Sequence, residues 1–267
     1  VNSLKLENIG GRPVFVMGGE ILRGAKQDRM LQGDLLVPPK SGPLVVRAFC
    51  TEQGRWVQET SQFQASEMSV PNSVRGVAKA EKVQGRVWDS IAQNQSKLKV
   101  AAPTSAAREV YQDKQVQVDT KPYVDAFQDV SKVNRDAVGV IVTYGRKLVA
   151  VDVFGNGAIF AKLYPKLLRS YVVDVVNEPW QGDRDEAGAQ AVLAAAGAAS
   201  WTAGVTDGVG TALEFKAGQV HGTSLVRDGS VLHADAFEAD DTPALAPNRP
   251  GRLVEPRPYD NQIQQRR

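Results

Sequence analysis

The sequence predicts an α+β fold with an antiparallel, strand-rich N-terminal half, packed helices, and a C-terminal β-hairpin that rejoins the sheet. Three observations support this prediction. Apolar and polar residues alternate within the first 50 positions, which is typical of half-buried strands. The middle of the chain places apolar residues at helical spacing, and Asp228-Gly229 near its end is a strong hairpin signal.

The N-terminal half is predicted to form a sheet of short strands. Strands are expected over residues 3–8, 13–17, 30–37 and 44–50. Gly10-Gly11 is expected to turn the first strand directly into the second. The strand over 44–50 is apolar on both faces, which favours a covered position in the sheet.

The central part of the chain is predicted to be mainly helical. Helices are expected over residues 78–98, 106–113, 121–132 and 158–176, followed by an alanine-rich helix that Asp183 or Asp185 caps and that ends near Ala199. Pro122 suits the first turn of its helix, whereas Pro165 is expected to kink or restart the longest one.

A further hairpin is predicted around Gly145-Arg146, between strands over 138–144 and 147–154. A two-residue turn at that point places Asp152 opposite Gly139. The carboxylate then lies on a strand whose neighbouring residues are nearly all apolar, which makes it a candidate for a functional role.

The last hairpin fixes the expected positions of the two histidines. With Asp228-Gly229 as a two-residue turn, His221 pairs with Ala236 and His233 pairs with Ser224. In that register the two rings project from opposite faces of the sheet. A shared histidine metal site is therefore not expected.

Composition argues against several classes of protein. The 32 basic and 30 acidic residues are spread through the chain, unlike the clustered charge of a dedicated nucleic-acid binder. No apolar run is long enough to span a membrane, and the single cysteine, Cys50, excludes an internal disulfide. The chain begins with Val1-Asn2 rather than Met, which leaves a processed N-terminus and an extracytoplasmic location open. Neither a compartment nor a cofactor is assigned.

Residues 1–237 are predicted to form a single α+β domain. Residues 238–267 are first acidic and then rich in Pro, Arg and Gln, a composition without a core of its own. Such a tail is expected to lie on the parent domain or on a neighbouring copy. A homo-oligomer held together through the tail is therefore one expectation.

Two polar loops have the composition expected of a functional site. Residues 18–29 contain three glycines and five charged residues, and residues 49–56 combine a carboxylate, an amide, a guanidinium and an indole. The first loop departs from a phosphate-binding P-loop, because Ala25 separates Gly24 from Lys26 and no Ser or Thr follows. A looser anion site remains, formed by backbone N–H groups and basic side chains.

The candidate site combines residues of both loops with one helical residue. The ligand-binding candidates are Lys26, Gln27, Arg29, Arg55, Trp56 and Gln84, and the catalytic candidates are Glu52 and Asp28. The basic groups would neutralise an anion, the indole would stack on a ring, and a carboxylate would act as acid/base. Asp152 is a further carboxylate for an acid/base pair or a hard-metal site, and no metal ligand is assigned. The alternatives are solvated loop charges, a structural Arg55–Glu52 pair covered by Trp56, and capping of a strand edge by Gln84.

Five ordered motifs carry a resemblance to a known family. They are Glu20 with Gly24-Ala25-Lys26-Gln27-Asp28-Arg29, Cys50-x-Glu52-x-Gly54-Arg55-Trp56, Gln84-x2-Val87-Trp88, Phe160 through Tyr171, and Gly222 through His233. Together they resemble the bacterial ARG-and-rhodanese-phosphatase-superfamily-associated proteins over about residues 3–237. That family's name records an association with ADP-ribosylglycohydrolase-type and phosphatase-type domains. The resemblance implies a link to ADP-ribose or nucleotide metabolism and assigns no reaction.

The sequence leaves two functions open. The leading hypothesis is that the two loops bind, and process, a small anionic ligand such as a nucleotide or an ADP-ribose derivative. The alternative is a non-catalytic structural or assembly protein whose tail docks on a neighbouring subunit. Basic groups that pair only with internal carboxylates, with no cavity beside them, would favour the alternative.

Overall fold

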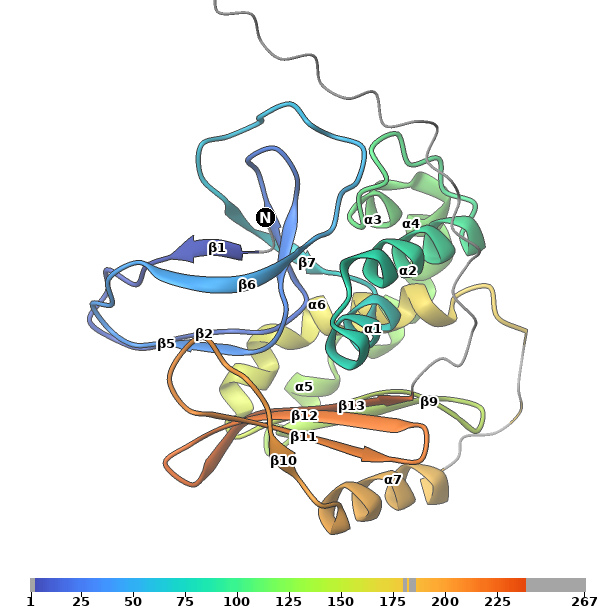
Figure 1. Cartoon of the computed structure of the whole chain (residues 1–267). Helices are drawn as coiled ribbons and strands as arrows, with labels where there is room; N and C mark the ends of the chain where they lie inside the picture. Colours follow the sequence, from blue (N-terminus) through green and yellow to red (C-terminus); the bar gives the residue numbers. More distant parts are fainter. Residues whose placement is uncertain (1–2, 180–181, 183–185, 239–267) are drawn as a thin grey trace, which may run out of the picture.

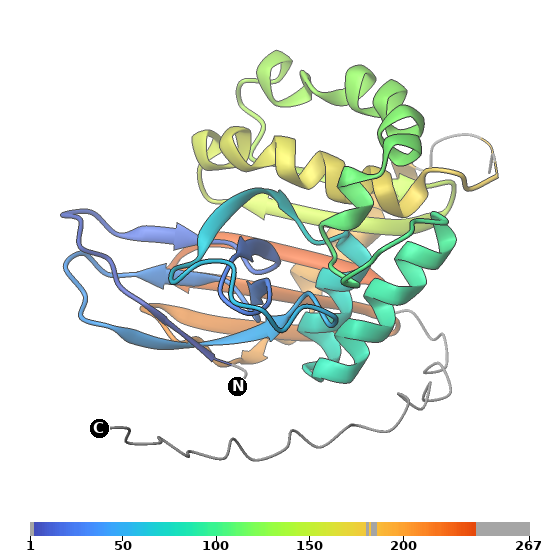
Figure 2. The ribbon, with the colours of Figure 1, turned by 90° about the horizontal axis from the view of Figure 1, so that it is seen from above.

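The computed structural model describes residues 3–179, 182 and 186–238, and it confirms the α+β class (Figure 1). Two larger antiparallel sheets, a two-stranded ribbon and a set of helices make up the described part of the chain (Figure 2). In the view of Figure 1 the N-terminal strands lie above the second sheet, with most of the helices beside and between them. The expected Asp183 or Asp185 cap and the predicted tail lie outside the described residues, apart from Glu238.

The N-terminal strands form a five-stranded sheet and a two-stranded ribbon. The sheet has the order β1 (Ser3–Leu6), β6 (Leu44–Cys50), β4 (Arg29–Leu31), β3 (Glu20–Arg23) and β7 (Gln64–Ser69), and the ribbon pairs β2 (Val14–Val16) with β5 (Leu35–Val37). The predicted direct turn from the first strand into the second is wrong, because β1 pairs with β6 and β2 with β5. The Asn8 side chain holds the intervening loop, since its Nδ2 donates to the carbonyl oxygens of Arg12 (2.8 Å) and Pro38 (3.0 Å).

The single strand predicted over 30–37 is two strands in different units. Gln32, Gly33 and Asp34 separate β4 from β5. The Asp34 carboxylate accepts a hydrogen bond from the backbone N–H of Gly18 (2.8 Å) and forms an ion pair with Lys79 (3.3 Å). These contacts turn the chain away from the line of β4.

The helices follow the predicted regions with shifted ends. They are α1 (Asn72–Glu81), α2 (Gln84–Lys97), α3 (Glu109–Gln112), α4 (Lys114–Phe127), α5 (Val130–Val133), α6 (Gly157–Val175) and α7 (Glu186–Ala198). The helix predicted over 78–98 is divided because Lys82 adopts a left-handed conformation with φ of 57°. Pro122 lies inside α4 rather than in its first turn, since Asp113 caps that helix at the backbone N–H groups of Gln115 and Val116.

The second sheet contains the C-terminal hairpin. Its order is β10 (Thr202–Ala203), β11 (Thr211–Ala217), β12 (Val220–Arg227), β13 (Ser230–Glu238), β9 (Lys147–Phe154) and β8 (Gly139–Tyr144). The hairpin therefore joins a sheet as predicted, and β9 is its partner there. The strands β10 and β11 were not predicted, and neither were β3 and β7 of the N-terminal sheet.

A β-bulge changes the predicted register of the last hairpin. The pairing shifts between Leu225 and Val226, so that His221 lies opposite Phe237 and His233 lies opposite Leu225. Directly opposed residues share a face, and so do alternate residues of one strand. The two histidines consequently lie on the same face, and the predicted opposite orientation is wrong.

A second bulge has the same effect on the other hairpin. The register shifts between Val142 and Thr143, which places Asp152 opposite Val140 rather than Gly139. A single extra residue reverses the inward and outward assignment beyond the bulge, and turn signals alone do not reveal it. Asp152 is nevertheless fully buried, with a relative exposure of 0%.

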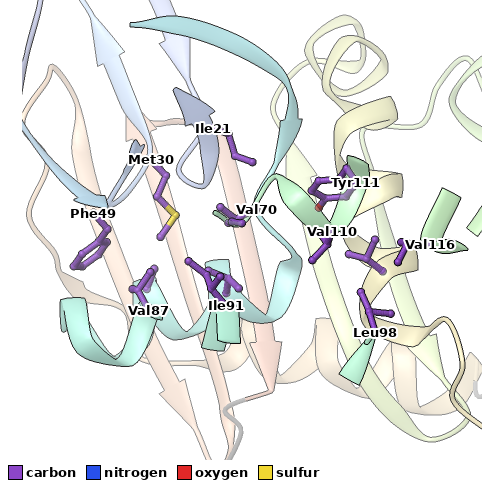
Figure 3. Close-up of a cluster of buried hydrophobic side chains, with 14 of the residues drawn as sticks. Ile21, Met30, Phe49, Val70, Val87, Ile91, Leu98, Val110, Tyr111 and Val116 are labelled. Atoms are coloured by element: carbon purple, nitrogen blue, oxygen red, sulfur yellow. The ribbon is translucent and has the colours of Figure 1, made fainter. Parts of the chain in front are cut away.

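The hydrophobic core fills two layers. One cluster lies between the N-terminal sheet and the helices, where Ile21, Met30 and Phe49 face Val87 and Ile91 of α2 (Figure 3). A second cluster joins α6 to β9, and α7 packs on the opposite face of the same sheet (Figure 1). None of the described helices is long and apolar enough to cross a membrane.

Candidate functional site

The two polar loops meet in the folded chain. Arg55 Nη2 lies 2.6 Å from Glu52 Oε2 and 3.1 Å from Asp28 Oδ1, which brings residues of both loops into one contact. Arg108, just before α3, pairs with Asp28 and lies 3.7 Å from Glu52 Oε1. We call Asp28, Glu52, Arg55 and Arg108 the loop cluster.

The loop cluster is closed and electrically balanced. Glu52 is 0% exposed and Asp28 1% exposed, so their charges are compensated by the two guanidinium groups rather than by water. Burial alone would raise the pKa of Glu52, but hydrogen bonds from Arg55, from Thr104 and from the Asp28 backbone hold that pKa below its usual range. A carboxylate that is ionised in this way is unsuited to donate a proton as a general acid.

Several other predicted residues contact the protein itself. The Gln84 amide caps the end of β6, where its Nε2 donates to the Cys50 carbonyl oxygen (2.9 Å) and its Oε1 accepts from the Cys50 backbone N–H (2.8 Å). Gln27 Nε2 donates to the Gln53 carbonyl oxygen (3.3 Å), and Arg29 Nη1 contacts Cys50 Sγ (2.6 Å). These contacts join the three side chains to neighbouring parts of the protein, and their predicted role in ligand binding stays a prediction.

Lys26 and Trp56 differ from the rest of the predicted set. Trp56 is 69% exposed, and the exposed Lys26 forms no ion pair with any described residue. Two cavities, of about 970 and 50 Å³, lie among the residues that the structure describes. None of the eight predicted residues lines either of these two. A ligand-binding role at the loops therefore stays a prediction.

A second charged cluster lies at the junction of the two sheets with α1. We call it the core network, and its members are Asp34, Arg75, Lys79, Asp152, His233 and Asp235. Arg75 forms a two-pronged pair with Asp152, with N–O distances of 2.7 and 2.6 Å. His233 bridges Asp34 at 2.6 Å and Asp152 at 3.0 Å, and Lys79 pairs with Asp34 and Asp235. Asp152 therefore lies in this network and not with Asp28 and Glu52.

The core network carries three cations and three carboxylates. Burial alone would lower the pKa of His233, but Asp34 and Asp152 together raise it to about 9. The imidazole is therefore protonated at neutral pH, with both ring nitrogens donating to carboxylates. Two facing cations, Arg75 and Lys79, hold the pKa values of Asp152 and Asp34 far below the usual range, despite burial.

The donor set of Asp152, His233 and Asp235 resembles a metal site in its spacing only. One ligand atom from each residue lies within 4.8 Å of the others. A metal ion needs a neutral imidazole and free carboxylate oxygens, whereas here Arg75 and Lys79 already bind the carboxylates. The residues fit a buried ion-pair network and do not fit a resident metal.

The larger of the two described cavities is a groove between α1, α2 and one end of the six-stranded sheet. Its volume is about 970 Å³. A smaller cavity of about 50 Å³ lies beside Asp34, Lys79 and Thr223. The groove has a helix wall, formed by α1, α2 and the end of α6, and a strand wall, formed by the ends of β8, β9, β11, β12 and β13.

The basic groups on the helix wall are paired with carboxylates. Arg86 binds Glu81 (2.5 Å) and Lys97 binds Glu178 (2.5 Å). These partly exposed pairs contribute little to stability. Asp89 and Asp174 add two further carboxylates, so the helix wall carries more acidic than basic groups.

The strand wall is different. Arg146, Lys147 and Lys216 line the groove and form no ion pair within the part of the chain that the structure describes. Glu238 is the acidic residue on this wall. Burial and the charge of Lys216 lower the pKa of the nearby His221, which keeps its imidazole neutral at pH 7. No sequence pattern selects these residues, because isolated basic residues near hairpin turns are common on protein surfaces.

Comparisons with known proteins identify one family. A family model described as the ARG and Rhodanese-Phosphatase-superfamily-associated Protein domain matches residues 1–237. No curated protein and no solved structure matches the chain.

Proposed function

This chain belongs to the ARG and Rhodanese-Phosphatase-superfamily-associated Protein family, and we propose that it binds a small anionic ligand, such as a nucleotide or an ADP-ribose derivative, in the groove. The observation that carries this proposal is the strand wall, where three basic side chains without ion-pair partners among the described residues line a cavity of about 970 Å³. Unpaired basic groups beside an open cavity provide the charge that an anion needs.

The size of the groove supports a ligand larger than a single phosphate. Small-molecule sites usually have volumes of roughly 300–1,000 Å³, and the groove lies at the upper end of that range. Neutral His221 adds a hydrogen-bonding group beside Lys216 without adding charge. A nucleotide or an ADP-ribose derivative has both the size and the negative charge that this lining suits.

Titration calorimetry with ADP-ribose, ADP and pyrophosphate tests the proposal. Lys147→Ala and Lys216→Ala are each expected to weaken binding by about tenfold, the effect of losing one charge-assisted hydrogen bond. Lys26→Ala is the matched control, because Lys26 is an equally exposed lysine in the predicted loop site. It is expected to leave the affinity unchanged.

The same titrations contain the results that would refute the proposal. If Lys26→Ala weakens binding and the two groove variants do not, the ligand binds at the loops. If none of the three ligands binds at millimolar concentration, anion binding is not the function.

The second candidate is a non-catalytic structural or assembly protein. The loop cluster favours it, because its basic and acidic groups compensate one another within the fold. Exposed Trp56 (69%) and Val57 (77%) beside that cluster provide apolar surface for a partner. Size-exclusion chromatography with light scattering, with and without residues 239–267, tests assembly through the tail; a monomer in both cases would rule it out.

A further inference from the structure

The helix wall of the groove contains a polar cluster at the start of α1, formed by Ser73, Asn94 and Asp174, which we call the groove floor. The Asp174 carboxylate, near the end of α6, accepts hydrogen bonds from Ser73 N (2.7 Å), Ser73 Oγ (2.7 Å) and Asn94 Nδ2 (2.9 Å). All three residues line the groove, on the wall opposite the unpaired basic groups. By itself this arrangement would be a carboxylate that stabilises a helix N-terminus.

Asn94 adds an observation that capping does not explain. Its side chain is buried, with a relative exposure of 6%, and its Oδ1 has no hydrogen-bond partner. An amide oxygen left unpaired in this way destabilises the protein, and such atoms in native proteins call for a partner. Asn94 is one of the residues that line the groove, so a donor bound on the groove floor would lie beside this amide.

We infer that the floor formed by Ser73, Asn94 and Asp174 binds the hydroxyl groups of a phosphorylated polyol, such as the ribose of a nucleotide, while the strand wall holds its phosphate. This inference rests on the proposed function, which it makes more specific. The ligand class is defined by two chemical ends, one that donates hydrogen bonds and one that is anionic.

Hydroxyl groups suit this floor better than ions do. A second anion would be repelled by Asp174. An ammonium group would meet Lys97, whose Nζ donates to the Asp174 carbonyl oxygen and pairs with Glu178. A hydroxyl can donate to Asn94 Oδ1 and also accept a hydrogen bond, without any charge to neutralise.

Pairs of ligands that differ only in their hydroxyl groups test the inference on the full, unaltered chain. Glycerol 3-phosphate is compared with propyl phosphate, and ribitol 5-phosphate with pentyl phosphate, by titration calorimetry. The polyol of each pair is expected to bind at least tenfold more tightly, since hydrogen-bonding sites strongly reject analogues that leave their buried groups unpaired. O-phosphoethanolamine, which replaces the hydroxyl by an ammonium group, is expected to bind no better than propyl phosphate.

Two variants of α2 test whether Asn94 causes the preference for the polyol. Asn94→Leu is expected to reduce the preference for the polyol to less than threefold while the affinity for propyl phosphate stays the same. Gln93→Leu is the matched control, since Gln93 is the neighbouring amide on the same groove wall and forms no hydrogen bond with Asp174 among the described residues. It is expected to keep the full preference.

The outcomes separate this inference from the proposed function. Equal affinities within both ligand pairs would overturn the hydroxyl floor and leave anion binding intact. Stronger binding of O-phosphoethanolamine than of glycerol 3-phosphate would also overturn it, in favour of an ammonium site. Binding of none of these phosphates would overturn both proposals. Should Asn94→Leu fail to fold, the ligand pairs on the wild-type chain still decide.

Discussion

The loop cluster and the strand wall of the groove are both rich in basic residues, but they differ in what those residues contact. In the loop cluster Arg55 and Arg108 face Asp28 and Glu52, and these carboxylates are almost completely buried. On the strand wall Lys147 and its basic neighbours border a cavity and have no ion-pair partner among the described residues. A charge-rich stretch of sequence can thus form either a structural cluster or a candidate site. In a structural cluster the charges are paired with one another, whereas in a candidate site they border a cavity without such partners.

The ion pair between Arg75 and Asp152 in the core network is buried more completely than the ion pairs of the loop cluster. Arg75→Met is therefore expected to have the largest effect on stability. The variant leaves the Asp152 carboxylate buried without its guanidinium partner, which costs about 3–5 kcal/mol. Urea denaturation measures the loss. Arg23→Met, which removes an ion pair with side chains 46% and 42% exposed, is the control and is expected to cost less than about 1 kcal/mol. Equal losses of stability in the two variants would mean that the burial of an ion pair does not determine its contribution to stability.

The pH dependence of stability gives the next largest effect. Because folding raises the pKa of His233 from 6.5 to about 9, its contribution is fully present below pH 6.5 and is lost as the pH rises through 9. The loss amounts to roughly 3 kcal/mol between those values. Urea denaturation at pH 6 and pH 9.5 is expected to show this decrease in the wild type and in His221→Asn, but not in His233→Asn. A decrease that persists in His233→Asn would assign it to another group.

Arg55→Met is expected to have an intermediate effect of about 1–3 kcal/mol. The loss is smaller than for Arg75 because Arg108 remains beside Asp28 and Glu52 to compensate their charge. Calorimetric affinity for ADP-ribose is expected to stay unchanged. An affinity at least tenfold lower, with unchanged stability, would instead make the loops the ligand site.

The smallest effect on stability is expected for Lys147→Ala and Lys216→Ala. Neither lysine has an ion-pair partner among the described residues, so the free energy of unfolding should change by less than about 0.5 kcal/mol. Thermal denaturation measures it alongside the binding titrations. A loss above about 1 kcal/mol would show that these residues stabilise the fold, and would weaken the comparison with the loop cluster.

Part of the candidate site was accessible from sequence. The contact between the two polar loops was expected, and Asp152 was selected because a carboxylate on an apolar strand is unusual. The basic residues of its network, Arg75 and Lys79, were not selected, although they lie four residues apart and so share one face of α1. That spacing is equally typical of a solvated helix face, and nothing local to α1 shows that this face is buried. The groove was missed for a related reason, since its walls come from segments spread between Asn72 and Glu238.

The sequence by itself determined the two C-terminal hairpins and most of the helical regions. The Asp228-Gly229 turn, the alternation along β6 and the periodicity of α6 reflect backbone and side-chain preferences that act over a few residues. Only the tertiary structure decided strand partners, the registers altered by bulges, and which charges are neutralised. Asp34 and His233, for example, meet across 199 positions of the chain. Such contacts depend on how distant elements pack against one another, and local preferences carry no information about that arrangement.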